Sequence, residues 1–190
     1  MTQIDWPVLC QPTLEEMERV EALARADGRD VRVPIGGGWV NYADGQHTAA
    51  SPQSIAQDTP TLLTVDGEGD ATMTLYHRSM TTDVWSGNTL RPSAVGEVYL
   101  VRVTMLAAKS TSADTFLELD LGIGEGWGTV IADERKPLIK GQSVTDKLSF
   151  TFPIYCLDTF CQRGGRFYLL ASNAVTVCDK AIFIQRTFTP

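Results

Sequence analysis

The segment from residue 144 to residue 152 alternates regularly between polar and apolar side chains. Leu148, Phe150 and Phe152 lie in one phase of the alternation, and Lys147, Ser149 and Thr151 lie in the other. Successive side chains of a β-strand point to opposite faces of a sheet. The pattern therefore predicts a strand with one face in a core and the other face in water. It is not the pattern of an amphipathic helix, whose apolar residues recur every three or four positions.

Similar short segments follow one another from residue 61 to the end of the chain. We predict strands at residues 61–65, 73–76, 97–107, 116–123, 129–131, 144–152, 167–171, 175–178 and 181–188. Turn-forming residues separate them, and we interpret residues 66–70, 133–137 and 162–165 as turns. Many short strands without intervening helices predict an all-β fold, an antiparallel sandwich or barrel, and exclude a doubly wound α/β fold.

One amphipathic helix is predicted before the strands, at residues 13–27. Thr13 and Glu16 have the spacing of a capping box, and Gly28 provides a C-terminal stop. Gly36–Gly38 then predicts a flexible hinge, so we divide the chain into an arm at 1–38 and a β domain at 39–190. The apolar stripe of the helix either packs on its own domain or docks on another surface, and the sequence leaves both open.

Length and charge restrict the classes of partner. The 190 residues suffice for one β domain with a core, and the net charge is −7. The 16 Lys and Arg residues are scattered rather than gathered into a basic face, which argues against a nucleic-acid partner. The first residues lack the pattern of a secretory signal, and no apolar run has the length of a membrane span. We therefore expect that the protein is made in a cytoplasm and that it does not associate with a membrane.

Cysteine and histidine positions do not predict a metal centre. Cys156 and Cys161 lack the close spacing of a zinc pair, and His47 and His77 lie far from them in sequence. We expect buried free thiols, no metal and no cofactor. The acidic turn at residues 66–70 lacks the downstream glutamate of a calcium loop and is interpreted as a solvated turn.

Catalytic signatures are also missing from the sequence. There is no G-x-S-x-G nucleophile motif, and Gly36–Gly38 lacks the spacing and the lysine of a phosphate-binding loop. The two histidines carry no local motif that would pair them with a thiol. We therefore expect that the protein is not an enzyme.

Two tryptophan-containing segments resemble loops that bind carbohydrate. Such sites combine an exposed aromatic ring with polar side chains on loops. The candidate ligand-binding residues are Trp85, Asn88, Arg91 and Trp127. The other interpretation, which we prefer at this stage, places both tryptophans in the core or in a subunit interface.

Three segments resemble the jelly-roll domains of tailed-phage virion proteins, which are similar to TNF-like and C1q-like folds. They are residues 97–107, residues 117–124 and the tail from 167–170 through 181–188, and the resemblance covers about residues 40–190. It implies an antiparallel TNF-like jelly-roll β-sandwich that assembles as a homotrimer. In such a trimer Tyr168, Phe183 and Phe188 are candidates for either the core or the threefold axis.

The resemblance also implies a function. We expect a structural virion protein, specifically a capsid decoration (cement) protein that binds the outer head lattice and stabilises it. Its partners would be its own copies and the major capsid protein or another virion protein, and its location would be the virion. The arm residues expected in the capsid contact are Trp6, Leu14, Met17 and Val20. The alternative is a fibre tip that binds a receptor or carbohydrate through the loop residues named above.

Overall fold

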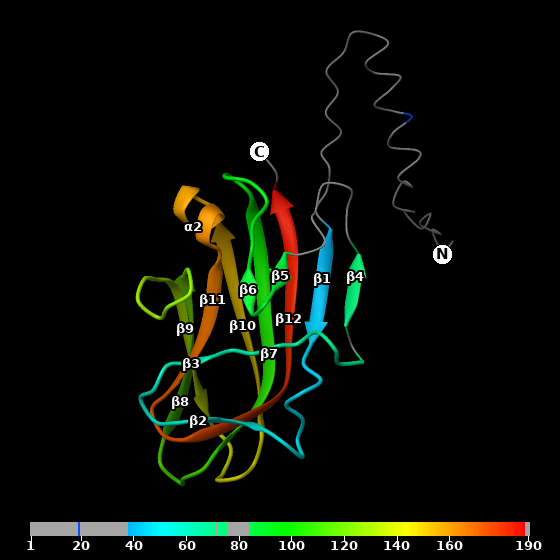
Figure 1. Cartoon of the computed structure of the whole chain (residues 1–190). Coiled ribbons are helices and arrows are strands. Elements are labelled where there is room, and N and C mark those ends of the chain that lie inside the picture. The colour runs from blue at the N-terminus through cyan, green and yellow to red at the C-terminus, as the bar shows by residue number, and fades with distance from the viewer. Residues whose placement is uncertain (1–18, 20–37, 71, 76–83, 189–190) are drawn as a thin grey trace, which may run out of the picture. The chain divides into compact units, whose positions relative to one another are not determined.

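A computed structural model describes residue 19 and residues 38–70, 72–75 and 84–188. The chain divides into two units, residues 1–35 and 36–190, and the β structure belongs to the second (Figure 1). The predicted helix at 13–27, Arg19 excepted, lies outside the described residues. So do the four arm residues expected in a capsid contact, Trp6, Leu14, Met17 and Val20.

Sheet A contains six strands. Its order is β10 (Asp146–Tyr155), β7 (Val98–Lys109), β12 (Val175–Phe188), β1 (Trp39–Ala43) and β4 (Met73–Leu75), with β2 (Gln53–Ile55) also paired with β12. All of these pairings are antiparallel. The long strands β7 and β12 form the centre of the sheet.

Sheet B also contains six strands. Its order is β5 (Trp85–Ser86), β6 (Thr89–Leu90), β11 (Gly165–Ala171), β8 (Thr115–Ile123) and β9 (Val130–Leu138), with β3 (Thr61–Leu62) also paired with β11. These pairings are antiparallel as well. Sheet B faces sheet A, and Figure 1 shows β8, β9 and β11 on the opposite side of the sandwich from β12 and β1.

The order of the strands confirms the jelly-roll prediction. The chain crosses from sheet A to sheet B between β7 and β8, and returns between β9 and β10. Strand β11 then pairs with the free edge of β8, and β12 pairs with the free edge of β7. Each of β7 and β8 therefore has two antiparallel partners. This wrapping of one set of paired strands by the next is the jelly-roll connection.

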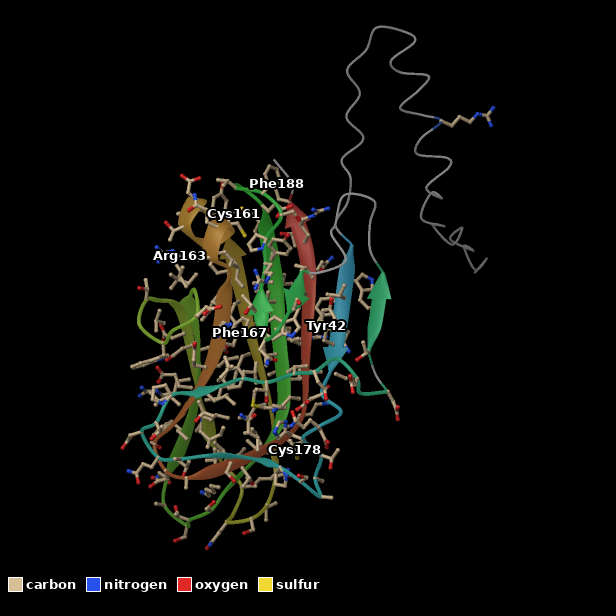
Figure 2. The ribbon with its side chains drawn as sticks, in the orientation of Figure 1. Tyr42, Cys161, Arg163, Phe167, Cys178 and Phe188 are labelled. Atoms are coloured by element: carbon tan, nitrogen blue, oxygen red, sulfur yellow. The ribbon has the colours of Figure 1, made fainter. Side chains whose placement is uncertain are left out.

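Residues 144–152 form the predicted strand with one face in the core, because most of them belong to β10. In β10 every second side chain is buried, including Phe150 and Phe152. The ring centroid of Phe152 lies 5.5 Å from that of Phe167 in β11, which joins the two sheets across the core. Figure 2 shows Phe167 in the space between the sheets.

The prediction of a charged turn at 133–137 is wrong, because these residues belong to β9. The strand pairs with β8 as far as Leu138 and has its other edge beside β10. Its charges fit an edge strand, where they discourage pairing with a further chain. Glu134 accepts a hydrogen bond from the backbone N–H of Thr151 at 2.8 Å, and Lys136 lies 5.7 Å from the centroid of the Phe150 ring.

Two other local predictions are corrected. Residues preceding Gly164 form the short helix α2 (Asp158–Arg163) rather than a turn, and Gly164 ends it with a φ of 68°. A Cβ on Gly164 would lie only 2.6 Å from the carbonyl oxygen of Leu90, so this position needs glycine. The two predicted C-terminal strands are one strand, β12, with a bulge between Cys178 and Ala181.

Candidate functional site

Three rows of side chains cross the outer face of sheet A near the end of β12. Val98 is the cross-strand partner of both Tyr155 and Phe188, and Leu100 occupies the next outward position of β7. The apolar side chains of these rows form what we call the outer-face patch, which consists of Trp39, Val98, Leu100, Tyr155, Phe183 and Phe188. Tyr155 is 61% exposed and Phe188 is 54% exposed. Phe188 is labelled at the end of β12 in Figure 2.

Aromatic stacking orders one side of the outer-face patch. The rings of Trp39 and Phe183 are stacked with centroids 5.8 Å apart, and the guanidinium carbon of Arg102 lies 5.2 Å from the Phe183 centroid. A cation over an aromatic face is attracted by the ring electrons. The three side chains therefore form a preformed layer of apolar surface with one positive charge beside it.

Acidic side chains are almost absent from this face although the protein is acidic. Apart from Asp179 at the bulge of β12, no outward-facing residue of β1, β7, β10 or β12 is Asp or Glu. The outer face of sheet B differs, because it carries Glu118, Asp120 and Asp133. The acidic charge of the domain is thus unevenly divided between its two broad faces.

A second feature lies on the outer face of sheet B, where the loop between β8 and β9 folds back over the sheet. The Tyr168 hydroxyl donates a hydrogen bond to the backbone oxygen of Glu125 at 2.9 Å. The indole N–H of Trp127 donates to Oδ2 of Asp120 at 3.0 Å. An open hollow in this loop is lined by residues 123–129 and by Arg163 of α2.

Asp120 is the most electrostatically perturbed acid of this loop region. It is 3% exposed, and its Oδ1 has no hydrogen-bond partner. Burial raises the pKa of Asp120 above its usual value, the nearby carboxylates of Glu118 and Asp133 raise it further, and the hydrogen bond from Trp127 opposes them. The ionised form of Asp120 therefore costs folding free energy.

Replacing Asp120 with asparagine is expected to stabilise the protein by about 1 kcal/mol at pH 7, because it removes a buried negative charge that the nearby carboxylates of Glu118 and Asp133 disfavour. Asparagine keeps an oxygen acceptor for Trp127 and removes the buried charge. Because the folded-state pKa of Asp120 is raised, the wild type loses stability relative to the variant as pH rises through that pKa. Urea unfolding at pH 3 and pH 7 checks this: a stability difference that does not shrink at pH 3 would contradict the assignment.

The buried group that most resembles catalytic machinery is enclosed. Lys180 Nζ lies 3.0 Å from Oδ2 of Asp44 and 3.1 Å from Nδ1 of His47. The side chains of Lys180 and Asp44 have no exposed surface. A substrate cannot reach either of them in this conformation, so their geometry fits a structural role.

The structure separates the sequence-predicted ligand residues. Trp85 is buried in the core, where its indole N–H donates to the carbonyl oxygen of Val65 and its ring lies 6.2 Å from that of Phe167. Asn88 has a positive φ and accepts a hydrogen bond from the Val65 N–H at 2.8 Å, so it shapes a turn. Arg91 is exposed and Trp127 is 47% exposed. Of the two tryptophans, Trp127 alone presents its ring at the surface.

The outer-face patch was only partly foreseen from the sequence. The sequence predicts either a core or a threefold-axis position for Phe183 and Phe188. In the structure both lie on the outer face of sheet A. Tyr168 lies on the outer face of sheet B under the β8–β9 loop. The sequence pattern did not predict the position of Tyr155. A usable signal was present in residues 98–101, where the side chains of both alternation phases are apolar, because a strand with two apolar faces needs cover on both sides.

Of the three described cysteines, which are free, Cys156 and Cys178 are buried and Cys161 is partly exposed. Burial raises the pKa of Cys156 to about 12, which makes its thiol unreactive. Among the described residues, no group of three His, Cys, Asp or Glu side chains has the arrangement of a metal site. Within the same residues, no helix has both the length and the apolar character needed to cross a bilayer.

Comparison with known proteins finds distant structural likenesses. No protein-family model matches the sequence, and no curated protein matches it. The PRD1 vertex protein P5 aligns with a TM-score of 0.47 and 16% identity, covering 82% of this chain and 99% of that chain. The Eiger TNF from S. frugiperda aligns with a TM-score of 0.44 and 10% identity, covering 80% and 92%.

A third solved structure, the dimeric latent PorU from Porphyromonas gingivalis, aligns with a TM-score of 0.38 and 13% identity. It covers 83% of this chain but 13% of that much longer chain. Likenesses at these identities and TM-scores assign no function. The class of this domain, an antiparallel jelly-roll β-sandwich, follows from its own strand order.

Proposed function

We propose that this protein is a non-catalytic structural subunit that assembles with its own copies through the outer-face patch. The observation that carries the proposal is the patch itself, a group of apolar side chains on a sheet face with almost no acidic residues, of which Tyr155 and Phe188 are more than half exposed. Monomeric proteins expose large apolar patches rarely, because covering such a surface is favourable. A second copy of the chain is the occupant that we infer.

Charge explains why a copy is a suitable occupant. Two copies of a chain with a net charge of −7 repel each other, and the repulsion is strongest where acids face each other. Contact through the outer faces of sheet B would bring Asp133 of both copies together, along with Glu118 and its ion-pair partner Arg135. Contact through the outer-face patch avoids this, and the one charge at its centre is the positive Arg102.

The more specific proposal is a homotrimeric capsid decoration protein on the outer head lattice of a virion. It is supported by the resemblance of the β segments to phage virion domains and by the closed jelly roll that the structure shows. A subunit that binds only the assembled lattice would stabilise that lattice by mass action. The arm at 1–38 would supply part of the contact with the major capsid protein or another virion protein.

Replacing Tyr155 with glutamate is expected to convert the assembly into monomers. Tyr155 is 61% exposed in the single chain, so the substitution costs the subunit little, whereas burying an unpaired carboxylate in an interface costs several kcal/mol. The measurement is the native mass by light scattering at two protein concentrations. The wild type is expected at three chain masses and the variant at one.

The matched control is Phe116→Glu, which places the same charge at an aromatic residue that is 42% exposed on the outer face of sheet B. This control is expected to keep the wild-type mass. A wild type that is monomeric at both concentrations would refute self-assembly, and loss of assembly in both variants would refute the assignment to the outer-face patch.

Binding to particles tests the capsid role separately. Protein carrying the arm is expected to sediment with capsids. Deletion of residues 1–30 is expected to abolish this while leaving the number of chains in the assembly unchanged. Particle binding that survives the deletion would remove the arm from the proposed contact.

A further inference from the structure

The β8–β9 loop presents an aromatic ring in a fixed orientation at the protein surface. The Trp127 ring is held by the hydrogen bond from its indole N–H to Asp120 at 3.0 Å, yet 47% of the residue remains exposed. Tryptophan that contributes to folding usually buries most of its area, as Trp85 does in this domain. The exposed face of Trp127 is therefore available to stack on a ligand.

Hydrogen bonds also hold the backbone around the ring. The Ile123 N–H donates to the oxygen of Thr129 at 3.0 Å, and the Gly124 N–H donates to the oxygen of Gly164 at 2.9 Å. The Tyr168 hydroxyl, on the outer face of sheet B, donates a hydrogen bond to the backbone oxygen of Glu125. A loop that is already ordered loses little conformational entropy when a ligand binds.

Charged hydrogen-bonding groups border the same hollow. Glu125 has an exposed carboxylate whose contact with Arg166, at 3.4 Å, is long for an ion pair, so it can accept bonds from a ligand. Arg163 lines the hollow from α2 and offers several N–H donors (Figure 2). Gly126 and Gly128 carry no side chain that would cover the space between these groups and the ring.

The chemistry of the hollow selects among ligands. It is open rather than enclosed, so it suits a polar ligand that is only partly desolvated, unlike the closed apolar pockets of most small-molecule sites. A nucleobase would also stack, but Arg163 is the one cationic side chain in the lining of the hollow, and Glu125 in the same lining, with Glu118 and Asp133 near Asp120, disfavours phosphate. A pyranose has an apolar C–H face for the indole and hydroxyl groups for a carboxylate and a guanidinium.

We propose that the β8–β9 loop is a binding site for an uncharged pyranose, with Trp127 as the stacking platform and Glu125 and Arg163 as hydrogen-bonding groups. The site lies on sheet B, whereas the outer-face patch lies on sheet A, so the proposal stands whether or not the chain assembles. Trp85, Asn88 and Arg91 are not part of it.

The test uses the full chain and a panel of methyl glycosides of glucose, galactose, mannose and N-acetylglucosamine, with glucuronic acid and N-acetylneuraminic acid as the charged arm. Saturation-transfer NMR detects weak binding without immobilising the protein. We expect saturable binding of at least one uncharged glycoside and weaker binding of both acids. Absence of saturable binding to all four glycosides, or a preference for the acids, would overturn the proposal.

Variants locate the site. Trp127→Ala is expected to weaken binding at least about tenfold, which corresponds to 1.4 kcal/mol. Trp127→Tyr keeps an aromatic ring, and its affinity for the glycoside is expected to lie between that of Trp127→Ala and that of the wild type. The control Phe116→Ala removes another exposed aromatic side chain from the same face, outside the hollow, and should bind as the wild type does. Binding by Trp127→Ala that equals the wild type would also overturn the proposal, and native mass should be unchanged in all variants.

Discussion

Replacing Glu97 with glutamine is expected to lower the free energy of unfolding by about 3 kcal/mol, the cost of removing the charge of one member of a buried ion pair. Glu97 and Arg186 are each 1% exposed at the side chain and are joined at 2.8 Å. Glutamine has nearly the same shape as glutamate, so the change removes charge without creating a cavity. The positive charge of Arg186 then remains buried without the carboxylate.

The carboxylate of Glu97 is also the acceptor for several other donors. Its Oε2 accepts from the Tyr99 hydroxyl at 2.7 Å and from the backbone N–H groups of Ser93 and Ala94 at 2.8 and 3.0 Å. Burial alone would raise the pKa of Glu97, but these bonds and Arg186 outweigh it and lower the pKa. The stability that Glu97 contributes is therefore complete above the ordinary glutamate pKa and is lost as pH falls through the lowered value.

Urea unfolding of the two proteins at equal concentration checks this, since assembly would make stability depend on concentration. The matched control is Glu118→Gln, which breaks the partly exposed ion pair between Glu118 and Arg135. That control is expected to change stability by less than about 1 kcal/mol. Equal losses in the two variants, or acid sensitivity that is unchanged in Glu97→Gln, would contradict the role assigned to the buried pair.

Replacing Lys180 with methionine is the second substitution with a large expected effect, a loss of about 3–5 kcal/mol of unfolding free energy. Lys180 occupies the bulge of β12, and its Nζ binds Oδ2 of Asp44 at 3.0 Å, Oε1 of Gln53 at 2.5 Å and Oγ1 of Thr64 at 3.3 Å. One ammonium group thus connects β12 to three preceding segments. Methionine fills similar space but leaves the Asp44 carboxylate buried without its cation.

A double-mutant cycle separates this electrostatic effect from general loss of packing. Burial raises the pKa of Asp44, but the hydrogen bonds from Lys180 and His47 outweigh it and lower the pKa, which shows that the folded protein favours the carboxylate. In Lys180→Met the added change Asp44→Asn removes the uncompensated charge. We expect the double variant to recover more than about 1 kcal/mol relative to the sum of the single changes.

Lys140→Met serves as the control, because Lys140 is exposed and its Nζ donates a hydrogen bond to the backbone oxygen of Thr145. It is expected to change stability by less than about 0.5 kcal/mol. Additive losses in the cycle would mean that Lys180 and Asp44 act independently, contrary to the structure.

Much of the fold was predictable because alternation in a strand is a local property. The pattern of Leu148, Phe150 and Phe152 depends only on which face of one strand meets the core, and β10 follows it. The boundaries failed where local composition was ambiguous. Residues 133–137 are charged like a turn, and pairing with β8 together with contacts beside β10 makes them a strand.

The sequence by itself determined the class of fold and the positions of most strands. It could not decide where a given aromatic residue lies, because Trp85 and Trp127 both occur beside glycine and polar residues. The tertiary structure decided that Trp85 is core and Trp127 is surface.

The tertiary structure also assembled the outer-face patch and the two buried ion pairs. Tyr155, Val98 and Phe188 become neighbours only through the register of β10, β7 and β12. Glu97 meets Arg186, and Asp44 meets Lys180, across long separations in the chain. The physical reason is that hydrogen-bond register in a sheet and packing between sheets are long-range relations, whereas the alternation that predicts a strand is contained within a few residues.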